Sequence, residues 1–300
     1  MSILLLASIT ILLGTLYPLI IDALSMGKIS VGAPYFNAVF VPMMIVLFSL
    51  MGIGPLIRWK KAKKGDLPKQ VNIINIISVS FGVIWPFLVL GEFNIMAAIG
   101  MALACWVTLA VMKDLKNQGR IGQKWTISAI PLNHFGMALA HMGIAVTIVG
   151  VTMVSTYEIE LNVRMAPSEQ IEIASYTIEY NGTKNVEGPN YSAIQGQFSI
   201  LDDGEFVSLL QPEQRTYTVQ SMGMTEAGID SNLFRDIYVA LGDPLGNNAW
   251  SVRIYYKPFI VWIWLGAIFM AIGGIMAIVS KRYRKLRDVD LVNDASREAV

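Results

Sequence analysis

Six long apolar stretches constrain this chain more than any other feature of its sequence. They cover residues 3–24, 38–57, 71–90, 94–112, 133–155 and 258–280. A helix of about 20 apolar residues crosses the roughly 30 Å hydrocarbon layer of a bilayer. With 54% hydrophobic and only 15% charged residues among its 300, the chain has more apolar surface than a soluble core would take up. The sequence therefore predicts an integral membrane protein, mostly α-helical, with about six transmembrane helices.

Basic residues indicate how these helices are oriented. Of the 23 Lys and Arg residues, 15 follow the second, fourth and sixth stretches, and in a six-span protein these three segments share one side of the membrane. Cytoplasmic loops are enriched in Lys and Arg. We therefore expect residues 58–70, residues 113–130 and both chain ends to face the cytoplasm.

The segment between the fifth and sixth stretches has a different character. Residues 156–255 contain 14 acidic residues against five basic ones, and short runs alternate with period two, at 171–173, 176–180 and 250–255. Asn-Gly at 181–182 and Asp-Gly at 203–204 are typical of turns between strands. The pattern predicts an inserted extracytoplasmic antiparallel β-rich domain. Apolar spacing between Thr225 and Leu241 is more helical, which predicts a short helix within this domain.

These observations give four regions. A five-helix membrane region covers residues 1–155, the β-rich domain residues 156–255, the final transmembrane helix residues 256–281, and a cytoplasmic tail residues 282–300. The net charge of +1 and the absence of a clustered basic surface argue against nucleic acid as a partner. One cysteine, Cys105, excludes an intramolecular disulfide and a CxxC redox pair.

The only two histidines lie in the fifth apolar stretch. His134 and His141 are seven residues apart, and hence nearly on one face of a helix. A rise of about 1.5 Å per residue puts His141 roughly 13 Å into the bilayer, if the helix starts near Leu132. A histidine at that depth needs a partner, as a metal or haem ligand, in a proton relay, or in a structural hydrogen bond. Small residues nearby allow either a bulky planar group or close approach of another helix; they are Gly136, Ala138, Ala140, Gly143 and Ala145.

Other ionisable groups in or near the membrane have simpler interpretations. His134 is close to the cytoplasmic interface, where we expect solvent or lipid headgroups to be its partners. Asp22 and Glu92 are at the outer ends of the first and third helices and are interpreted as solvated end groups.

Several runs of residues resemble the C-terminal half of the cytochrome c-type biogenesis protein CcmF, of the haem lyase family. They follow one another in order over nearly the whole chain, at residues 27–37, 52–56, 136–143, 188–190, 225–230 and 253–259. A sibling in the family that is dedicated to nitrite reductase is similar in this half.

The resemblance implies a role in cytochrome c maturation in the bacterial inner membrane, with residues 156–255 in the periplasm. Members of the family form the membrane component of a haem lyase, which receives haem from the chaperone CcmE. The lyase joins that haem to the thiols of apocytochrome c, with the thiol-handling protein CcmH alongside. The family also holds a haem b between transmembrane helices, thought to take electrons from quinol. On this resemblance His141 is an axial ligand of the haem b iron, whereas no catalytic residue and no role for His134 are implied.

The family's tryptophan-rich segment, its two periplasmic haem-binding histidines and its other transmembrane haem ligand belong to the N-terminal half. None of them occurs in this sequence, so we expect the chain to act with an N-terminal half of the lyase. An alternative from another class is a non-catalytic membrane scaffold in which His141 is structural. A transporter is disfavoured because no pair of broken helices and no cluster of intramembrane charges marks a substrate site.

The orientation can be tested with single cysteines in a chain that lacks Cys105. Asp203→Cys and Gly65→Cys should react with a membrane-impermeant maleimide from opposite sides of the membrane, because the first belongs to the acidic segment and the second to a basic loop. Labelling of both positions from the same side would contradict the six-span arrangement.

Overall fold

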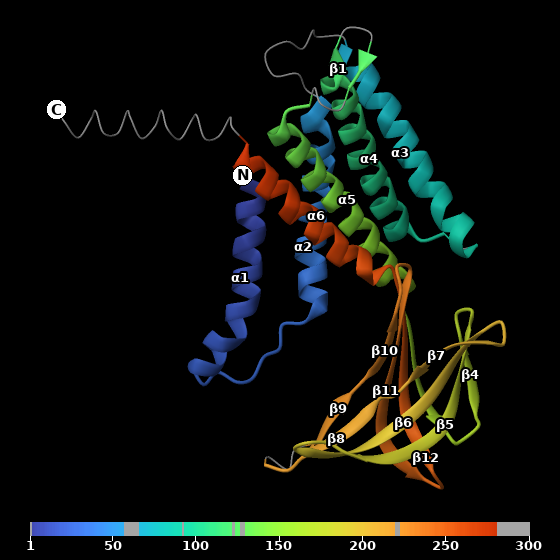
Figure 1. The fold of residues 1–300 in the computed structure, drawn as a ribbon. Helices are drawn as coiled ribbons and strands as arrows, with labels where there is room; N and C mark the ends of the chain where they lie inside the picture. Colours follow the sequence, from blue (N-terminus) through green and yellow to red (C-terminus); the bar gives the residue numbers. More distant parts are fainter. Residues whose placement is uncertain are drawn as a thin grey trace. The chain divides into compact units, whose positions relative to one another are not determined.

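The computed structural model describes residues 2–56, 66–91, 93–121, 124–126, 130–219 and 223–280. The chain divides into two compact units (Figure 1). One unit contains residues 1–148 together with 266–300, and the other contains residues 149–265.

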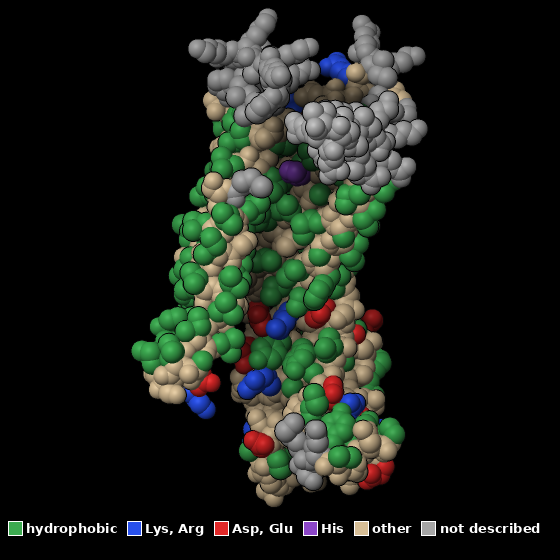
Figure 2. All heavy atoms as spheres, turned by 90° about the vertical axis from the view of Figure 1, so that its left-hand side faces the viewer, with side chains coloured by type: hydrophobic (Ala, Val, Ile, Leu, Met, Phe, Trp, Pro, Cys, Tyr) green, Lys and Arg blue, Asp and Glu red, His purple; other side chains and the backbone are tan. Residues whose placement is uncertain are grey.

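Among the described residues, six helices are long and apolar enough to cross a membrane, as the sequence predicts. They are α1 (Ser2–Ala23), α2 (Ala33–Ile53), α3 (Asp66–Leu90), α4 (Ile95–Gln118), α5 (Leu132–Tyr157) and α6 (Ile260–Val279). A short 3-10 helix, η1 (Gly54–Leu56), follows α2. Leucine and isoleucine side chains of α1, α3 and α6 are widely exposed, and in Figure 2 most visible side chains of the helices are hydrophobic. Such surfaces are suited to lipid, which makes the protein a multi-pass membrane protein.

The helices α5 and α6 pack with their backbones in direct contact. A Cβ atom added to Gly136 would meet the carbonyl oxygen of Gly273 at 2.6 Å, and one added to Gly143 would meet that of Gly266 at 2.6 Å. The two glycines on each helix are seven residues apart and so recur on one face. Small residues at this spacing allow helices to approach closely where no hydrophobic driving force acts between them.

The described residues of the β-rich unit, 149–219 and 223–265, form ten strands. They are β3 (Ile159–Met165), β4 (Gln170–Ile173), β5 (Tyr176–Glu187), β6 (Tyr191–Asp202), β7 (Glu205–Leu210), β8 (Glu213–Tyr217), β9 (Gly223–Glu226), β10 (Gly228–Ser231), β11 (Arg235–Gly246) and β12 (Ala249–Pro258). One sheet has the order β10-β11-β12-β3; the other has the order β4-β5-β6-β8-β9, with β7 also paired to β6. Every pair is antiparallel, which confirms the predicted class.

Both sheets contribute alternate side chains to a single buried cluster. Tyr180 of β5 and Phe198 of β6 stack with ring centroids 4.9 Å apart. The same cluster contains residues of β11 and β12, among them Ile237, Val239 and Ile254, all fully buried. Burial at every second position is what a strand with one face on the core requires.

Two local predictions within this unit are wrong. The segment with helical spacing forms β9, β10 and the start of β11, because a four-residue spacing is also a multiple of the two-residue strand period; β11 buries Ile237, Val239 and Leu241 in turn. Asn-Gly at 181–182 is not a turn but a bulge inside β5, with Gly182 at φ +111°. Bulges and turns both favour glycine at positive φ, so the dipeptide does not distinguish them. Asp-Gly at 203–204 does form the β6–β7 turn.

Part of the basic pattern lies outside the described residues, including Arg58, residues 60–64 and residues 281–300. Of the remainder, Lys113 and Lys116 belong to the end of α4. Arg120 begins the two-residue strand β1 (Arg120–Ile121), which pairs with β2 (Lys124–Trp125). The inserted β strands start at Ile159 and end at Pro258, directly between α5 and α6.

The close α5–α6 contact predicts opposite effects for two alanine substitutions. Gly143→Ala should lower the thermal stability of the purified protein, because its methyl group would overlap the Gly266 carbonyl; overpacking of this kind costs about 1–3 kcal/mol. Gly274→Ala in α6 is the matched control, since open space surrounds that position, and alanine raises helix propensity. Equal unfolding temperatures for the two variants would contradict the contact.

Candidate functional site

The candidate intramembrane site is built on α4 and α5. These helices share a buried cluster, in which Val107 and Val111 of α4 and Ala138 and Ala145 of α5 take part. The indole N–H of Trp106 donates to the Ser49 carbonyl at 3.0 Å, which also ties α2 to α4. The packed helices α4 and α6 therefore hold α5, and with it both histidines, in a defined orientation.

His141 makes one hydrogen bond, within its own helix. Its Nδ1 lies 2.8 Å from the Met137 carbonyl oxygen. A carbonyl can only accept, so Nδ1 carries a proton, and in the neutral imidazole the lone pair is then on Nε2. No hydrogen-bond partner of Nε2 is present among the described residues, and the side chain is partly buried. This tautomer is the one that a metal-binding histidine adopts when a carbonyl fixes its other nitrogen.

His134 has a different partner from the one that we expected. Its Nε2 lies 2.5 Å from Oδ2 of Asp114 on α4, and the two side chains are only 20% and 11% exposed. The interpretation that solvent or headgroups satisfy His134 is therefore wrong. The hydropathy pattern missed Asp114 because the fourth apolar stretch ends at residue 112. The available signal was its spacing, since Asp114 follows Val107 and Val111 at helical intervals on the face that packs against α5.

The small residues of α5 have structural contacts. Gly136 and Gly143 face α6, and Ala140 also touches Gly273, while Ala138 and Ala145 lie in the cluster shared with α4. Of the remaining candidates, Asp22 is exposed at the end of α1, in keeping with a solvated end group, and Glu92 lies outside the described residues. Within the described part of the chain, no three His, Cys, Asp or Glu side chains gather as a metal site.

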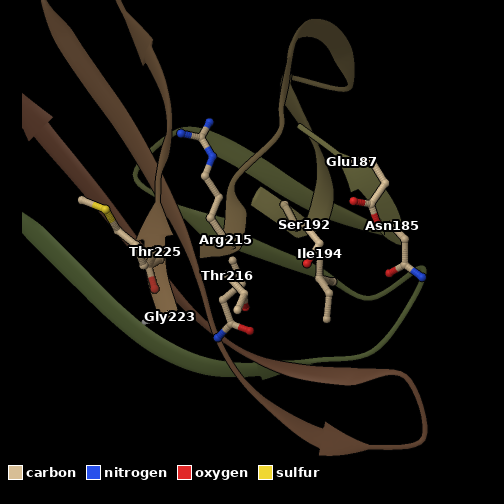
Figure 3. Close-up of a pocket in the computed structure, with 11 residues that line it drawn as sticks. Asn185, Glu187, Ser192, Ile194, Arg215, Thr216, Gly223 and Thr225 are labelled. Atoms are coloured by element: carbon tan, nitrogen blue, oxygen red, sulfur yellow. The ribbon is translucent and has the colours of Figure 1, made fainter. Parts of the chain in front are cut away.

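The β-rich unit has a cavity of about 580 Å³ over strands β5, β6, β8 and β9. Hydroxyl and amide groups dominate its lining, as Figure 3 shows for Asn185, Ser192, Thr216 and Thr225. Ile194 provides an apolar part of the wall. No described lining residue is a histidine or cysteine, so the lining offers polar contacts rather than a nucleophile with a base.

The one basic residue among the described residues of this lining is already engaged. Arg215 donates from Nε to Glu213 at 2.7 Å, lies 3.3 Å from Glu226, and stacks 4.5 Å above the Tyr191 ring. The hydrogen bond from Arg215 holds the pKa of Glu213 below its usual value, and the same bond raises the pKa of Arg215. Within the described residues, the cavity therefore has no strong unpaired positive charge for an anionic ligand.

Comparison with known proteins relates the β-rich unit to a described family. Residues 156–258 match the family described as the CcmF C-terminal beta-sandwich. The chain is 42% identical over 285 residues to the cytochrome c-type biogenesis protein CcmF of Pseudomonas fluorescens, and the match covers 94% of this chain and 43% of that protein. CcmF of Escherichia coli strain K12 is 37% identical over 279 residues, covering 93% of this chain and 42% of that protein.

Two further similarities extend this comparison. The cytochrome c-type biogenesis protein NrfE of Haemophilus influenzae is 32% identical over 288 residues, covering 93% of this chain and 43% of that protein. A solved structure, that of a protein named Cytochrome c Heme Lyase CcmF, has the same fold, with a TM-score of 0.73 at 18% identity over 93% of this chain and 44% of that chain. The chain thus spans less than half the length of the curated relatives that it matches.

The Asp114–His134 contact predicts non-additive effects on stability. His134→Ala should destabilise the purified protein by about 1–3 kcal/mol, because it leaves a buried carboxylate without its partner. Asp114→Ala in the His134→Ala background should then cost little more, or restore part of the stability. Thermal unfolding of the wild type, both single variants and the double variant measures the coupling; strictly additive losses would show that the two side chains do not interact.

Proposed function

Because the chain belongs to the CcmF family of cytochrome c-type biogenesis proteins, we propose that it is the C-terminal part of the membrane component of a cytochrome c haem lyase. Its location is then the bacterial inner membrane, with the β-rich domain, residues 156–255, in the periplasm. The observation that carries the proposal is the state of His141, whose Nδ1 is fixed by a carbonyl at 2.8 Å while Nε2 has no partner among the described residues.

The residues present fit one axial position of a haem b. His141 would ligate the iron through Nε2, and the hydrogen bond from Nδ1 to the Met137 carbonyl would hold the ring in its orientation. Haem bound there supplies one-electron chemistry, since its iron changes between two oxidation states. The apolar and small residues of α4 and α5 would keep water away from that position.

A shared haem also accounts for the required partners. No second histidine faces the same site, because His134 is held by Asp114, so the other axial ligand would come from an N-terminal half of the lyase. The family resemblance adds the haem chaperone CcmE, the thiol-handling protein CcmH, apocytochrome c as substrate and quinol as electron donor. The excess of acidic over basic residues in 156–255 suits this domain to docking of a basic partner.

A non-catalytic scaffold is the second candidate, and one observation favours it. The hydrogen bond of His141 lies within its own helix, and the α5–α6 contact needs no cofactor. A histidine that only satisfies its own helix is a plausible structural residue in a membrane. The two candidates differ in whether His141 is needed for haem or only for stability.

Haem binding distinguishes them. The chain expressed alone should bind little haem, and co-expression with an N-terminal half of a CcmF protein should give a low-spin b-type spectrum. His141→Ala should remove that absorbance and reduce cytochrome c maturation, while membrane insertion is kept. Added imidazole should restore part of the absorbance, because it can refill a ligand-sized cavity at iron but does not replace an intrahelical hydrogen bond.

His134→Ala is the control within the same helix. It should lower stability through Asp114 but leave the haem content per folded molecule unchanged. If the purified His141→Ala complex keeps a normal haem content and spectrum, the ligand assignment is wrong and the scaffold takes its place. Tight bis-histidine haem binding by the chain alone would instead point to His134 or to a homodimer.

A further inference from the structure

The hairpin between β10 and β11 carries two exposed apolar side chains at its tip. Leu233 and Phe234 are 49% and 58% exposed. Turns that face water usually carry Gly, Pro, Asn, Asp or Ser at such positions. A leucine followed by a phenylalanine is therefore unusual for a solvated tip.

This tip lies against the beginning of α6. The Phe259 N–H donates to the Phe234 carbonyl at 2.8 Å, and the indole N–H of Trp262 donates to the Leu233 carbonyl at 3.0 Å. The rings of Phe234 and Phe259 are 5.8 Å apart between centroids, and those of Phe259 and Trp262 are 5.1 Å apart. Because α6 begins at Ile260 and is one of the six spans, the tip is level with the first turn of a transmembrane helix.

Most backbone polar groups of the tip form hydrogen bonds within the protein. Asn232 Oδ1 accepts from the N–H groups of Phe234 and Arg235, at 2.8 and 2.9 Å. The Asn232 N–H donates to the Arg235 carbonyl at 2.9 Å. The carbonyls of Leu233 and Phe234 accept from Trp262 and Phe259, so four of the six backbone polar groups of residues 232–234 have partners within the protein. Each backbone group that the protein satisfies lowers the cost of bringing such a segment next to the apolar part of a bilayer.

Charges near the tip are paired with carboxylates. Arg235 is only 4% exposed, contacts Asp230, and lies 4.6 Å from the centre of the Tyr176 ring. Lys257 lies 3.0 Å from Glu158. Among the described residues, the tip therefore presents an apolar surface without a free cation beside it that would select anionic headgroups.

We propose that the Leu233–Phe234 tip inserts into the lipid interface of the bilayer, on the side of the β-rich domain. The tip would contact the apolar region just below the headgroups, where Trp side chains of membrane proteins also concentrate. The insertion gives the β10–β11 end of the domain a second membrane contact besides the two chain connections to α5 and α6. This inference does not depend on the proposed haem lyase function.

The test measures the depth of spin labels in the full chain, reconstituted in phosphatidylcholine nanodiscs. Nitroxides are attached at Leu233→Cys and Phe234→Cys in a Cys105→Ala background. The control is Val219→Cys, which is 91% exposed in the same unit. Two collision rates are measured for each label, one with oxygen, which concentrates in lipid, and one with a water-soluble nickel chelate. The ratio of the oxygen rate to the nickel rate should be several-fold higher at positions 233 and 234 than at position 219.

Each other outcome overturns the proposal. Strong collision with the nickel chelate at 233 and 234, as at 219, would place the tip in water. Weak collision with both reagents would show that protein covers the tip, such as another part of a longer lyase or a second copy. The oxygen preference should also be the same when about a third of the lipid is phosphatidylglycerol; a requirement for that anionic lipid would mean that headgroup charge rather than apolar insertion holds the tip.

Two substitutions at position 234 test whether the label, rather than the native side chains, determines the depth of the tip. They are Phe234→Asp and Phe234→Leu, each combined with the label at position 233. The aspartate should shift the label at 233 toward the nickel chelate, because a carboxylate is costly in the apolar interface, whereas the leucine should leave it unchanged. No shift with aspartate would contradict insertion. Both changes are at an exposed position, and both remove the ring contact with Phe259, so the leucine variant controls for the loss of that contact.

Discussion

Lack of water in the bilayer is the constraint on which this structure depends. Inside hydrocarbon a polar group must be satisfied by the protein itself, which leaves helices as the way for a chain such as this to cross. The same requirement explains the polar contacts of α5, where His141 binds the carbonyl of its own preceding turn and His134 binds Asp114 of α4. It also explains why α5 and α6 meet through glycines: burial of apolar side chains gives little gain between helices that already lie in lipid, so close backbone packing takes its place.

In the β-rich unit the hydrophobic effect drives burial of apolar side chains away from water, and apolar residues therefore alternate with polar ones along the strands. The β-rich unit buries alternate aromatic and aliphatic side chains between two antiparallel sheets. Its polar groups can rely on water or on ion pairs, such as Arg253 with Glu160 at 3.8 Å, which contribute little to stability when exposed. The buried Arg235–Asp230 pair is different, since removal of one partner would leave a desolvated charge. Its position next to the hairpin tip places a buried ion pair of this unit close to the start of α6.

The number and type of elements followed from the sequence because hydropathy and period-two alternation act over many residues. Six spans and an antiparallel β domain were predicted on that basis. The failures were local: a four-residue spacing fits both a helix and β11, and Asn-Gly fits both a turn and the bulge at Gly182. Asp114 was missed because the fourth apolar stretch ends at residue 112, although its helical spacing from Val107 and Val111 was a usable signal. The sequence alone also did not decide whether the small residues of α5 meet a cofactor or another helix, because small side chains allow either; the structure shows that Gly136 and Gly143 meet α6.

The packing of α5 limits how a second haem ligand could reach His141. An α-helix turns by about 100° per residue, so His141 projects about 140° away from Gly136 around the axis. Helix α6 packs against the side of α5 that carries Gly136 and Gly143. Helix α4 packs against the side that carries Ala138 and Ala145. His141 lies on the arc between them, nearer to α4. If it binds iron, a haem and the helix that carries the other ligand must approach α5 through this arc, because the glycine face leaves no room for even a methyl group. A helix that approaches from the α6 side would have to displace α6, whereas one that approaches through the arc leaves the α5–α6 contact intact.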